Sequence, residues 1–335
     1  MTSLPDQDVI QSLTDGITLS PSQMHALRNS LRELLVEACS AGLNCETKPS
    51  VTEDNARLKI DCFLKSISRY PAKRFSGRGI VICAGGIRMF RCAWVCINML
   101  RRFGCQLPVE MWALNDSELT IQMKAMIEPL GVEVVNAALV RRRHPARILN
   151  AWELKPFALV HSRFEEVILL DSDNVPLIDP EVLFSRRAYS KLGSIFWPDA
   201  GRFAQDHPIW RICKLKYRNE PQFESGQIVV DKNRSWKALR LTTHLNDHSD
   251  FYYRYVHGDK DTFYLAWRIL DQKFGMVPTP MKQLRGAMCQ HDFNGRRIFQ
   301  HRNFLKWDRE SGSITGFRFE KHCRLLLAKL DRELE

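Results

Sequence analysis

The sequence predicts an α/β fold with a mainly parallel sheet, and two observations lead to this prediction. Between residues 77 and 171, short apolar runs alternate with segments of helical periodicity. This pattern is typical of strands that pair in parallel through intervening helices. The composition is that of a folded protein, because 44% of the 335 residues are hydrophobic and 26% are charged. It excludes a disordered or collagen-like chain, and the length allows about two domains of roughly 150 residues.

The first elements can be justified in chain order from their boundaries. Ser20 and Pro21 form a helix start and Gly42 a helix stop, and a second helix is expected after Thr52. From Gly77 onward, glycines and apolar runs mark alternating strands and helices. We expect strands within 77–86, 108–114, 132–135 and 167–170, and helices at 89–103, 117–127 and 152–161.

Beyond Asp179 the pattern is less regular. We expect strands at 193–197 and 227–230, a helix at 260–270, a basic loop-rich stretch at 282–309 and a basic amphipathic helix at 319–330. These elements divide the chain into a helical N-terminal extension (1–76), a central α/β domain (77–310) and a C-terminal tail helix (311–335). Ligands bind at the carboxyl edge of such sheets. The glycines after Cys83 and the carboxylates after Leu170 should therefore lie at one edge.

The charge balance predicts an anionic partner. The chain has 49 Lys and Arg residues against 38 Asp and Glu, a formal net charge of +11, which attracts nucleic acid, phosphorylated molecules or acidic lipid. The basic run at 141–147, RRRHPAR, raises the alternative of a nucleic-acid binder. It lacks a surrounding aromatic platform, so we expect no specific nucleic-acid binding.

The sequence shows neither a secretory signal nor a membrane span. The amino terminus, MTSLPDQDVI, has no basic start and no apolar stretch, and the apolar region 80–100 is interrupted by Arg88 and Arg91. We therefore expect a cytoplasmic protein whose basic surface could contact an anionic membrane peripherally.

An acidic pair carries the strongest chemical signal. The apolar strand at 167–170 ends on Asp171, and Asp173 follows. Two neighbouring carboxylates repel each other unless a cation holds them. Oxygen ligands favour Mg²⁺ or Mn²⁺, which share their coordination with substrate phosphates. An EF-hand is excluded, because Pro176 stands where that loop requires glycine.

Two classes of enzyme place an acidic pair at the end of a strand. In a haloacid-dehalogenase-type phosphatase or phosphotransferase, Asp171 would be the nucleophile toward phosphorus. In a metal-dependent glycosyltransferase, the pair would grip a nucleotide-sugar diphosphate through the metal. The phosphatase also needs a later acidic pair at a strand end. The segment HGDKD at 257–261 leads into a helix without a preceding apolar strand, so the phosphatase is the weaker alternative.

Six ordered motifs carry a family resemblance. The segment at 151–184, AWELKPFALVHSRFEEVILLDSDNVPLIDPEVLF, precedes GSIFWPD at 193–199. The other motifs are GIVICAGG (79–86), LPVEMWAL (107–114), FESGQIVVDK (223–232) and HGDKDTFYLAW (257–267). Together they resemble the fungal-type α-mannosyltransferases of glycosyltransferase family 71, from about residue 77 to 307. From the printed sequence we expect no amino-terminal membrane anchor or stem like those of the Golgi members.

The resemblance implies a GT-A nucleotide-sugar transferase fold, with a donor-binding half (77–175) and an acceptor half (176–310). It implies transfer of a sugar with retained configuration, and mannose is the favoured sugar. GDP-mannose is the favoured donor, with a UDP-sugar as the alternative. The acceptor would be the hydroxyl of a glycan or a lipid-linked molecule, and Mn²⁺ or Mg²⁺ would be the cofactor.

The resemblance also indicates site residues. Gln227 and Asp261 are expected near the transferred sugar, with Asp259 as second choice to Asp261. The third metal ligand beside Asp171 and Asp173 would be His301, with His291 as the alternative. Donor contacts are expected from Asp171 and from glycines and basic residues around it: Gly85, Gly86, Arg88, Lys155, Arg302 and Lys306.

Overall fold

The computed structural model describes residues 51–308 and 310–334. The helix expected between Ser20 and Gly42 lies outside these residues. The described residues all belong to one compact unit. Within the described part of the chain, no helix is long and apolar enough to span a membrane.

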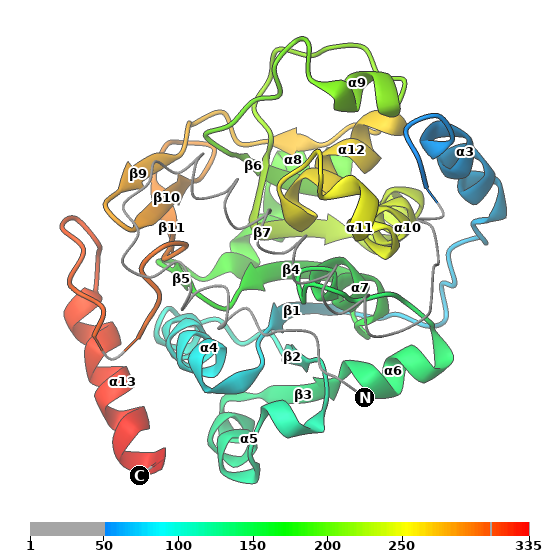
Figure 1. The fold of residues 1–335 in the computed structure, drawn as a ribbon. Coiled ribbons are helices and arrows are strands. Elements are labelled where there is room, and N and C mark those ends of the chain that lie inside the picture. The colour runs from blue at the N-terminus through cyan, green and yellow to red at the C-terminus, as the bar shows by residue number, and fades with distance from the viewer. Residues whose placement is uncertain (1–50, 309, 335) are drawn as a thin grey trace, which may run out of the picture. The chain divides into compact units, whose positions relative to one another are not determined.

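A seven-stranded mixed sheet forms the centre of this unit (Figure 1). Its first four strands are parallel to one another, β7 runs antiparallel to both of its neighbours, and β8 is parallel to β6. The predicted α/β fold with a mainly parallel sheet is therefore confirmed. The strand order is β3 (Val132–Asn136), β2 (Val109–Ala113), β1 (Arg78–Cys83), β4 (Glu166–Asp171), β7 (Phe223–Asp231), β6 (Ser194–Pro198) and β8 (Gly275–Met276).

Helices cover both faces of the sheet, because alternate side chains of each buried strand point to opposite faces. Val81 and Leu169 belong to one hydrophobic cluster, and Ile82 and Leu170 to the other. The first face is covered by α3 (Ala56–Ser66), α6 (Ala137–Arg143), α7 (Leu154–His161), α9 (Pro208–Ile212), α10 (Lys232–Asp247), α11 (Ser249–Tyr252) and α12 (Gly258–Ile269). The second face is covered by α4 (Gly86–Arg102), α5 (Ile121–Ile127), α8 (Arg187–Leu192) and α13 (Glu320–Leu334).

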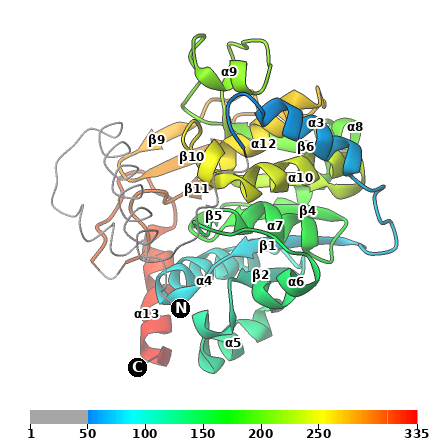
Figure 2. The same cartoon turned by 45° about the vertical axis from the view of Figure 1, so that its right-hand side comes forward.

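A second, four-stranded antiparallel sheet lies beside the first, as Figure 2 shows. Its strands follow the order β5 (Asn174–Pro176), β11 (Arg297–His301), β10 (Ala287–His291) and β9 (Lys282–Leu284). The expectation of a loop-rich stretch at 282–309 is therefore wrong for three segments. Their apolar runs are only one to three residues long and are flanked by polar or basic residues, so the strand pattern is weak in the sequence.

The other predicted strands and most helices are confirmed within a few residues. Three short 3₁₀ helices lie between them: η1 (Asp116–Glu118), η2 (Glu128–Leu130) and η3 (Pro180–Ser185). Helix α10 was not predicted, because its many polar residues obscure the buried stripe that includes Trp236 and Leu239. Helix α3, expected in the N-terminal extension, packs on α10 within the same compact unit.

The pairing of β1 with β4 determines where a ligand can bind. Cys83 lies opposite Asp171 in this pairing. The glycines after β1 and the carboxylates after β4 therefore share the carboxyl edge of the parallel strands, as predicted.

Candidate active site

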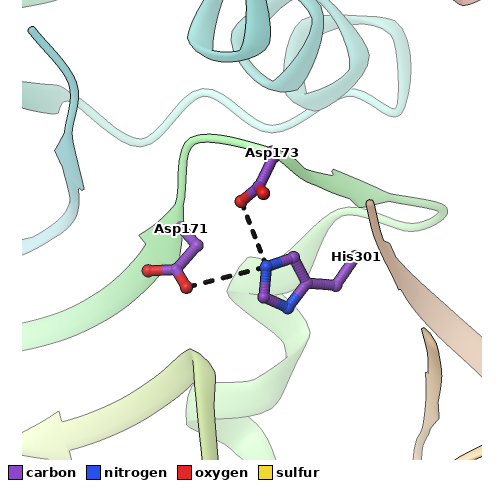
Figure 3. A group of neighbouring side chains, drawn as sticks. All are labelled: Asp171, Asp173 and His301. Carbon is purple, nitrogen blue, oxygen red and sulfur yellow. Dashed lines mark hydrogen bonds and ion pairs between the residues drawn. The ribbon is translucent and has the colours of Figure 1, made fainter. Parts of the chain in front are cut away.

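Two carboxylates and one imidazole meet at this edge (Figure 3). Nε2 of His301 lies 3.1 Å from Oδ1 of Asp173 and 3.7 Å from Oδ2 of Asp171. One ligand atom from each of the three residues lies within 4.8 Å of the others. We call Asp171, Asp173 and His301 the carboxylate–histidine group. The same three residues were predicted as metal ligands from the sequence.

Pairing between strands that are far apart in the chain brings His301 to this position. His301 is opposite Asn174 in the pairing of β11 with β5, and the amide of Arg302 donates to the carbonyl of Asp173 at 3.0 Å. Strand β5 starts directly after Asp173, so the short second sheet fixes the histidine beside the carboxylates.

Cationic groups balance the buried charge of Asp173. Burial would raise the pKa of this carboxyl, but Lys306 and His301 hold it well below its usual range. Nζ of Lys306 forms an ion pair with Oδ2 of Asp173. Burial would in turn lower the pKa of His301, whereas Asp173 and Glu224 raise it to about 10. The site is thus built to hold positive charge between its carboxylates.

The donor set fits a divalent cation. Carboxylate oxygens are the ligands that Mg²⁺ and Mn²⁺ favour, and an imidazole nitrogen is compatible with a transition ion such as Mn²⁺. Glu224 adds the outer contact that metal-binding histidines usually have, because Nδ1 of His301 lies 3.2 Å from its Oε1. A cation at Nε2 would take the place of the imidazolium proton that the carboxylates stabilise.

A second ionic group adjoins the first. Nζ of Lys155 lies 2.8 Å from Oδ1 of Asp171 and 3.0 Å from Oδ2 of Asp259. The same ammonium donates to Oγ of Ser225 at 3.0 Å, and this hydroxyl also donates to Asp259. Burial raises the pKa of Asp259 to about 6, while Lys155 acts in the opposite direction. Lys155 thus links Asp171 to a buried polar surface on α12 and β7.

Behind the histidine, four residues form a buried hydrogen-bonded network. The Glu224 carboxylate accepts from the amide of Gly226 at 2.7 Å and from Nε2 of Gln227. Nδ2 of Asn174 donates to Oε1 of Gln227 at 2.8 Å. A side chain at Gly226 would clash, since its Cβ would lie 2.5 Å from Nδ1 of His301. Gln227, predicted to contact the transferred sugar, here supports Glu224.

Three predicted site residues lie elsewhere. Arg302 follows His301 in extended chain, so its side chain points the opposite way. Its guanidinium lies 3.9 Å from the Trp307 ring centre and pairs with Glu320 at 3.0 Å, so Arg302 is not placed as a phosphate partner. His291 ends β10 opposite Arg297, about 10 Å along the strand from the position facing His301.

Asp261 is also separate from the carboxylate–histidine group. It accepts from the amide of His257 at 2.8 Å and pairs with Lys260 at 2.9 Å. Lys260 pairs on its other side with Asp199, also at 2.9 Å. Asp259, the second choice from the sequence, therefore lies beside Lys155. Asp261 instead caps the start of α12 by accepting from the amide of His257.

The glycines and Arg88 lie where β1 passes into α4. Gly85 is in close contact with Glu118, whose carboxylate would clash with an added Cβ, and Gly86 has a φ of +68°. The contact at Gly85 and the backbone conformation at Gly86 therefore favour glycine at both positions, whether or not a ligand binds there. Arg88 pairs with Asp308 at 2.9 Å, two residues beyond Lys306, and connects α4 to the segment that carries this lysine.

Glu224 and Ser225 were not among the site residues predicted from the sequence, and Asp259 was only the second choice to Asp261, yet the structure places all three at the site. The signal for the first two was the turn-like string FESGQ before an apolar strand. In the structure this string is part of β7 itself, buried along its length. Buried acidic and hydroxyl side chains in a central strand need partners, and this requirement could have singled them out.

Comparison with known proteins identifies the family of the chain. The Mannosyl_trans3 family of mannosyltransferases matches residues 77–217 and 213–302. The chain belongs to this family, and the predicted resemblance to fungal-type mannosyltransferases is confirmed. The α-1,2-mannosyltransferase MNN23 of Candida albicans is 25% identical over 309 residues, covering 75% of this chain and 48% of the relative. MNN2 of Saccharomyces cerevisiae, also an α-1,2-mannosyltransferase, is 24% identical, covering 69% and 46%.

The chain thus spans about half the length of the curated relatives it matches. Solved structures that resemble it include the galactosyltransferase LgtC and the glycosyltransferase GlyE. An active-site mutant of LgtC has 10% identity and a TM-score of 0.49, covering 75% of this chain and 95% of the other. GlyE of Streptococcus pneumoniae has 14% identity and a TM-score of 0.46, covering 77% and 64%. The phosphatase alternative, with Asp171 as nucleophile, is not supported.

Proposed function

We propose that the chain transfers a mannosyl group from a nucleotide-sugar donor to the hydroxyl of a glycan or lipid-linked acceptor. GDP-mannose is the favoured donor and a UDP-sugar the alternative. One observation supports this proposal above the others. In a chain of the mannosyltransferase family, the carboxylate–histidine group sits at the carboxyl edge of the sheet with Lys306 and Lys155 on either side. Retention of the anomeric configuration remains a prediction from the resemblance.

The carboxylate–histidine group would hold Mn²⁺ or Mg²⁺. Such an ion, when bound, neutralises negative charge on the leaving nucleoside diphosphate. Lys306 approaches Asp173 through its ammonium group. A bound cation would compensate Asp173, so the ammonium would be available to a phosphate oxygen. Both lysine and metal would then favour the charge that develops during transfer.

Lys155, Ser225 and Asp259 could bind the hydroxyl groups of the donor sugar. Asp259 and Ser225 are buried, and together with Lys155 they offer acceptors and a cation within hydrogen-bonding distance of one another. Sugar hydroxyls need such alternating donors and acceptors. Because Lys155 also pairs with Asp171, the sugar would be held next to the carboxylate–histidine group, which fixes its orientation for transfer.

A donor screen tests the proposal. Purified protein is incubated with GDP-mannose and with UDP-sugars, with Mn²⁺ supplied or chelated, and nucleoside diphosphate release is measured with and without a mannoside acceptor. We expect turnover that requires the metal and is abolished by Asp173→Asn. The matched control is Asp116→Asn, which removes an exposed carboxylate at η1 and should leave turnover unchanged. Metal-independent turnover, or full turnover by Asp173→Asn, would contradict the proposed site.

A further inference from the structure

A strongly basic pocket lies at the opposite end of α7 from Lys155. His161 ends this helix, about 9 Å along its axis from Lys155. The pocket measures about 560 Å³ and opens beside α6 and the segment before β1. Its lining consists of Arg74, Leu139, Val140, Arg142, Arg143, His144 and His161.

No acidic side chain of the described residues lines this pocket. Arg142 and Arg143 are exposed on the last turn of α6. Arg147 lies nearby in the same basic run but does not line the pocket. Its charge is compensated by Asp250, with which it pairs at 3.1 Å. A fourth guanidinium, that of Arg240 on α10, acts electrostatically on Arg74 and on both pocket histidines.

The histidines are arranged as neutral hydrogen-bonding groups. Their rings stack at 4.5 Å between centres, and Nη2 of Arg74 lies 2.8 Å from Nδ1 of His161. Since the guanidinium can only donate, Nδ1 accepts, and the neutral ring carries its proton on Nε2. Burial, together with Arg74 and Arg240, lowers the pKa of His161 to about 2. The pKa of His144 is lowered by the same causes.

So many like charges repel one another at close range, and a bound anion would relieve this repulsion. The cations come from three separate parts of the chain: Arg74 in the segment before β1, Arg142 and Arg143 on α6, and Arg240 on α10. A run of charges along one solvated helix would not converge in this way. The fold itself therefore brings the positive charges together.

We propose that this pocket is a second binding site, separate from the carboxylate–histidine group, for the phosphate or diphosphate group of an anionic ligand. The charged members are all arginines, and guanidinium forks match phosphate oxygens with two parallel hydrogen bonds. The same chemistry serves a free phosphorylated molecule and a phospholipid headgroup. Leu139, 50% exposed beside the arginines, would suit the headgroup.

A nucleic acid fits the pocket less well. The aromatic rings in contact with its lining are His144 and His161, which stack on each other, and the buried rings of Phe157 and Phe75, which contact His161 and Arg74 respectively. None of these rings is available as a platform for a base, and single-strand binding depends on such stacking. The basic run at 141–147 is thus explained by recognition of phosphate rather than of bases.

The test uses the full chain and inorganic pyrophosphate, titrated calorimetrically at low salt with a metal chelator present. The double variant Arg142→Gln/Arg143→Gln removes two exposed pocket charges. The control Arg187→Gln/Lys191→Gln removes two charges on α8, a helix on the other face of the sheet. Loss of two charge-assisted contacts should weaken pyrophosphate binding about tenfold or more in the first variant, and the control should bind like the wild type.

One further measurement, vesicle sedimentation, identifies the source of the phosphate. Sedimentation with phosphatidylcholine vesicles containing phosphatidic acid, lost in the pocket variant alone, would support a lipid headgroup. Pyrophosphate binding without vesicle binding would support a free anion. Equal pyrophosphate affinity in the two double variants would overturn the proposal. So would tight binding of a single-stranded oligonucleotide that depends on Arg142 and Arg143 when pyrophosphate binding does not.

Discussion

Glu224→Gln tests whether the network behind His301 controls metal binding. In the structure, one oxygen of Glu224 faces both Nδ1 of His301 and the amide of Gly226, and the other accepts from Gln227. The substitution keeps the shape of the side chain and removes its charge. An amide placed there can present its oxygen to His301 only by directing its NH₂ group at Nε2 of Gln227.

That mismatch is difficult to relieve. Gln227 could turn its own oxygen toward the new amide, but this oxygen already accepts from Nδ2 of Asn174. Either His301 loses its acceptor or two donors face each other in a buried site, and an unsatisfied buried polar group costs about 1–3 kcal/mol. This corresponds to a loss in metal affinity of about fivefold to 150-fold, which includes the tenfold to hundredfold range found for outer-shell partners of metal ligands.

The assay is a titration with Mn²⁺ followed by electron paramagnetic resonance of the free ion, so that it does not depend on turnover. We expect weaker binding by Glu224→Gln and a matching rise in the metal concentration for half-maximal turnover, with smaller effects on kcat at saturating metal. Glu128→Gln, an exposed carboxylate on η2, is the control. Superimposable binding curves for Glu224→Gln and the wild type would refute the reasoning.

Three further variants test the same geometry. His301→Ala should shift the metal titration strongly and His291→Ala should not, because only His301 lies beside the carboxylates; a shift for His291→Ala alone would reverse the assignment. Gly226→Ala should weaken Mn²⁺ binding in the same direction as Glu224→Gln, since the new Cβ would lie 2.5 Å from Nδ1 of His301 and 2.7 Å from Oε1 of Glu224; an unchanged Mn²⁺ affinity would show that the imidazole position is not critical.

Much of the main sheet could be predicted because its strands are buried on both faces. Continuous apolar runs such as the one before Asp171 are typical of parallel strands, and glycines mark their ends. The second sheet lacked this signal, since its strands are three to five residues long and β9, β10 and β11 carry basic residues at their ends. Such strands exist because of their pairing with one another, which a local pattern does not reveal.

The site residues differ in the same way in how far the sequence could predict them. Asp171 and Asp173 follow a strand that the sequence shows plainly, so their position at the sheet edge could be predicted from the residues. His301 was placed through the family resemblance, because its approach depends on the pairing of β11 with β5. Arg302 was misplaced for a related reason: without a recognised strand, the alternation that turns its side chain away from His301 was not visible. The cytoplasmic location stays a prediction.

A local sequence pattern cannot decide whether Asp259 or Asp261 faces the site. Two residues apart on a helix, their side chains differ by about 200° in direction, so both cannot face Lys155. Which one does depends on how α12 is rotated about its axis. Phe263, Leu265 and Trp267 are all fully buried, so the apolar residues surround the helix and define no single inward face. The rotation follows from packing against α10 and β7, and this packing turns Asp259 toward Lys155 and leaves Asp261 to Lys260.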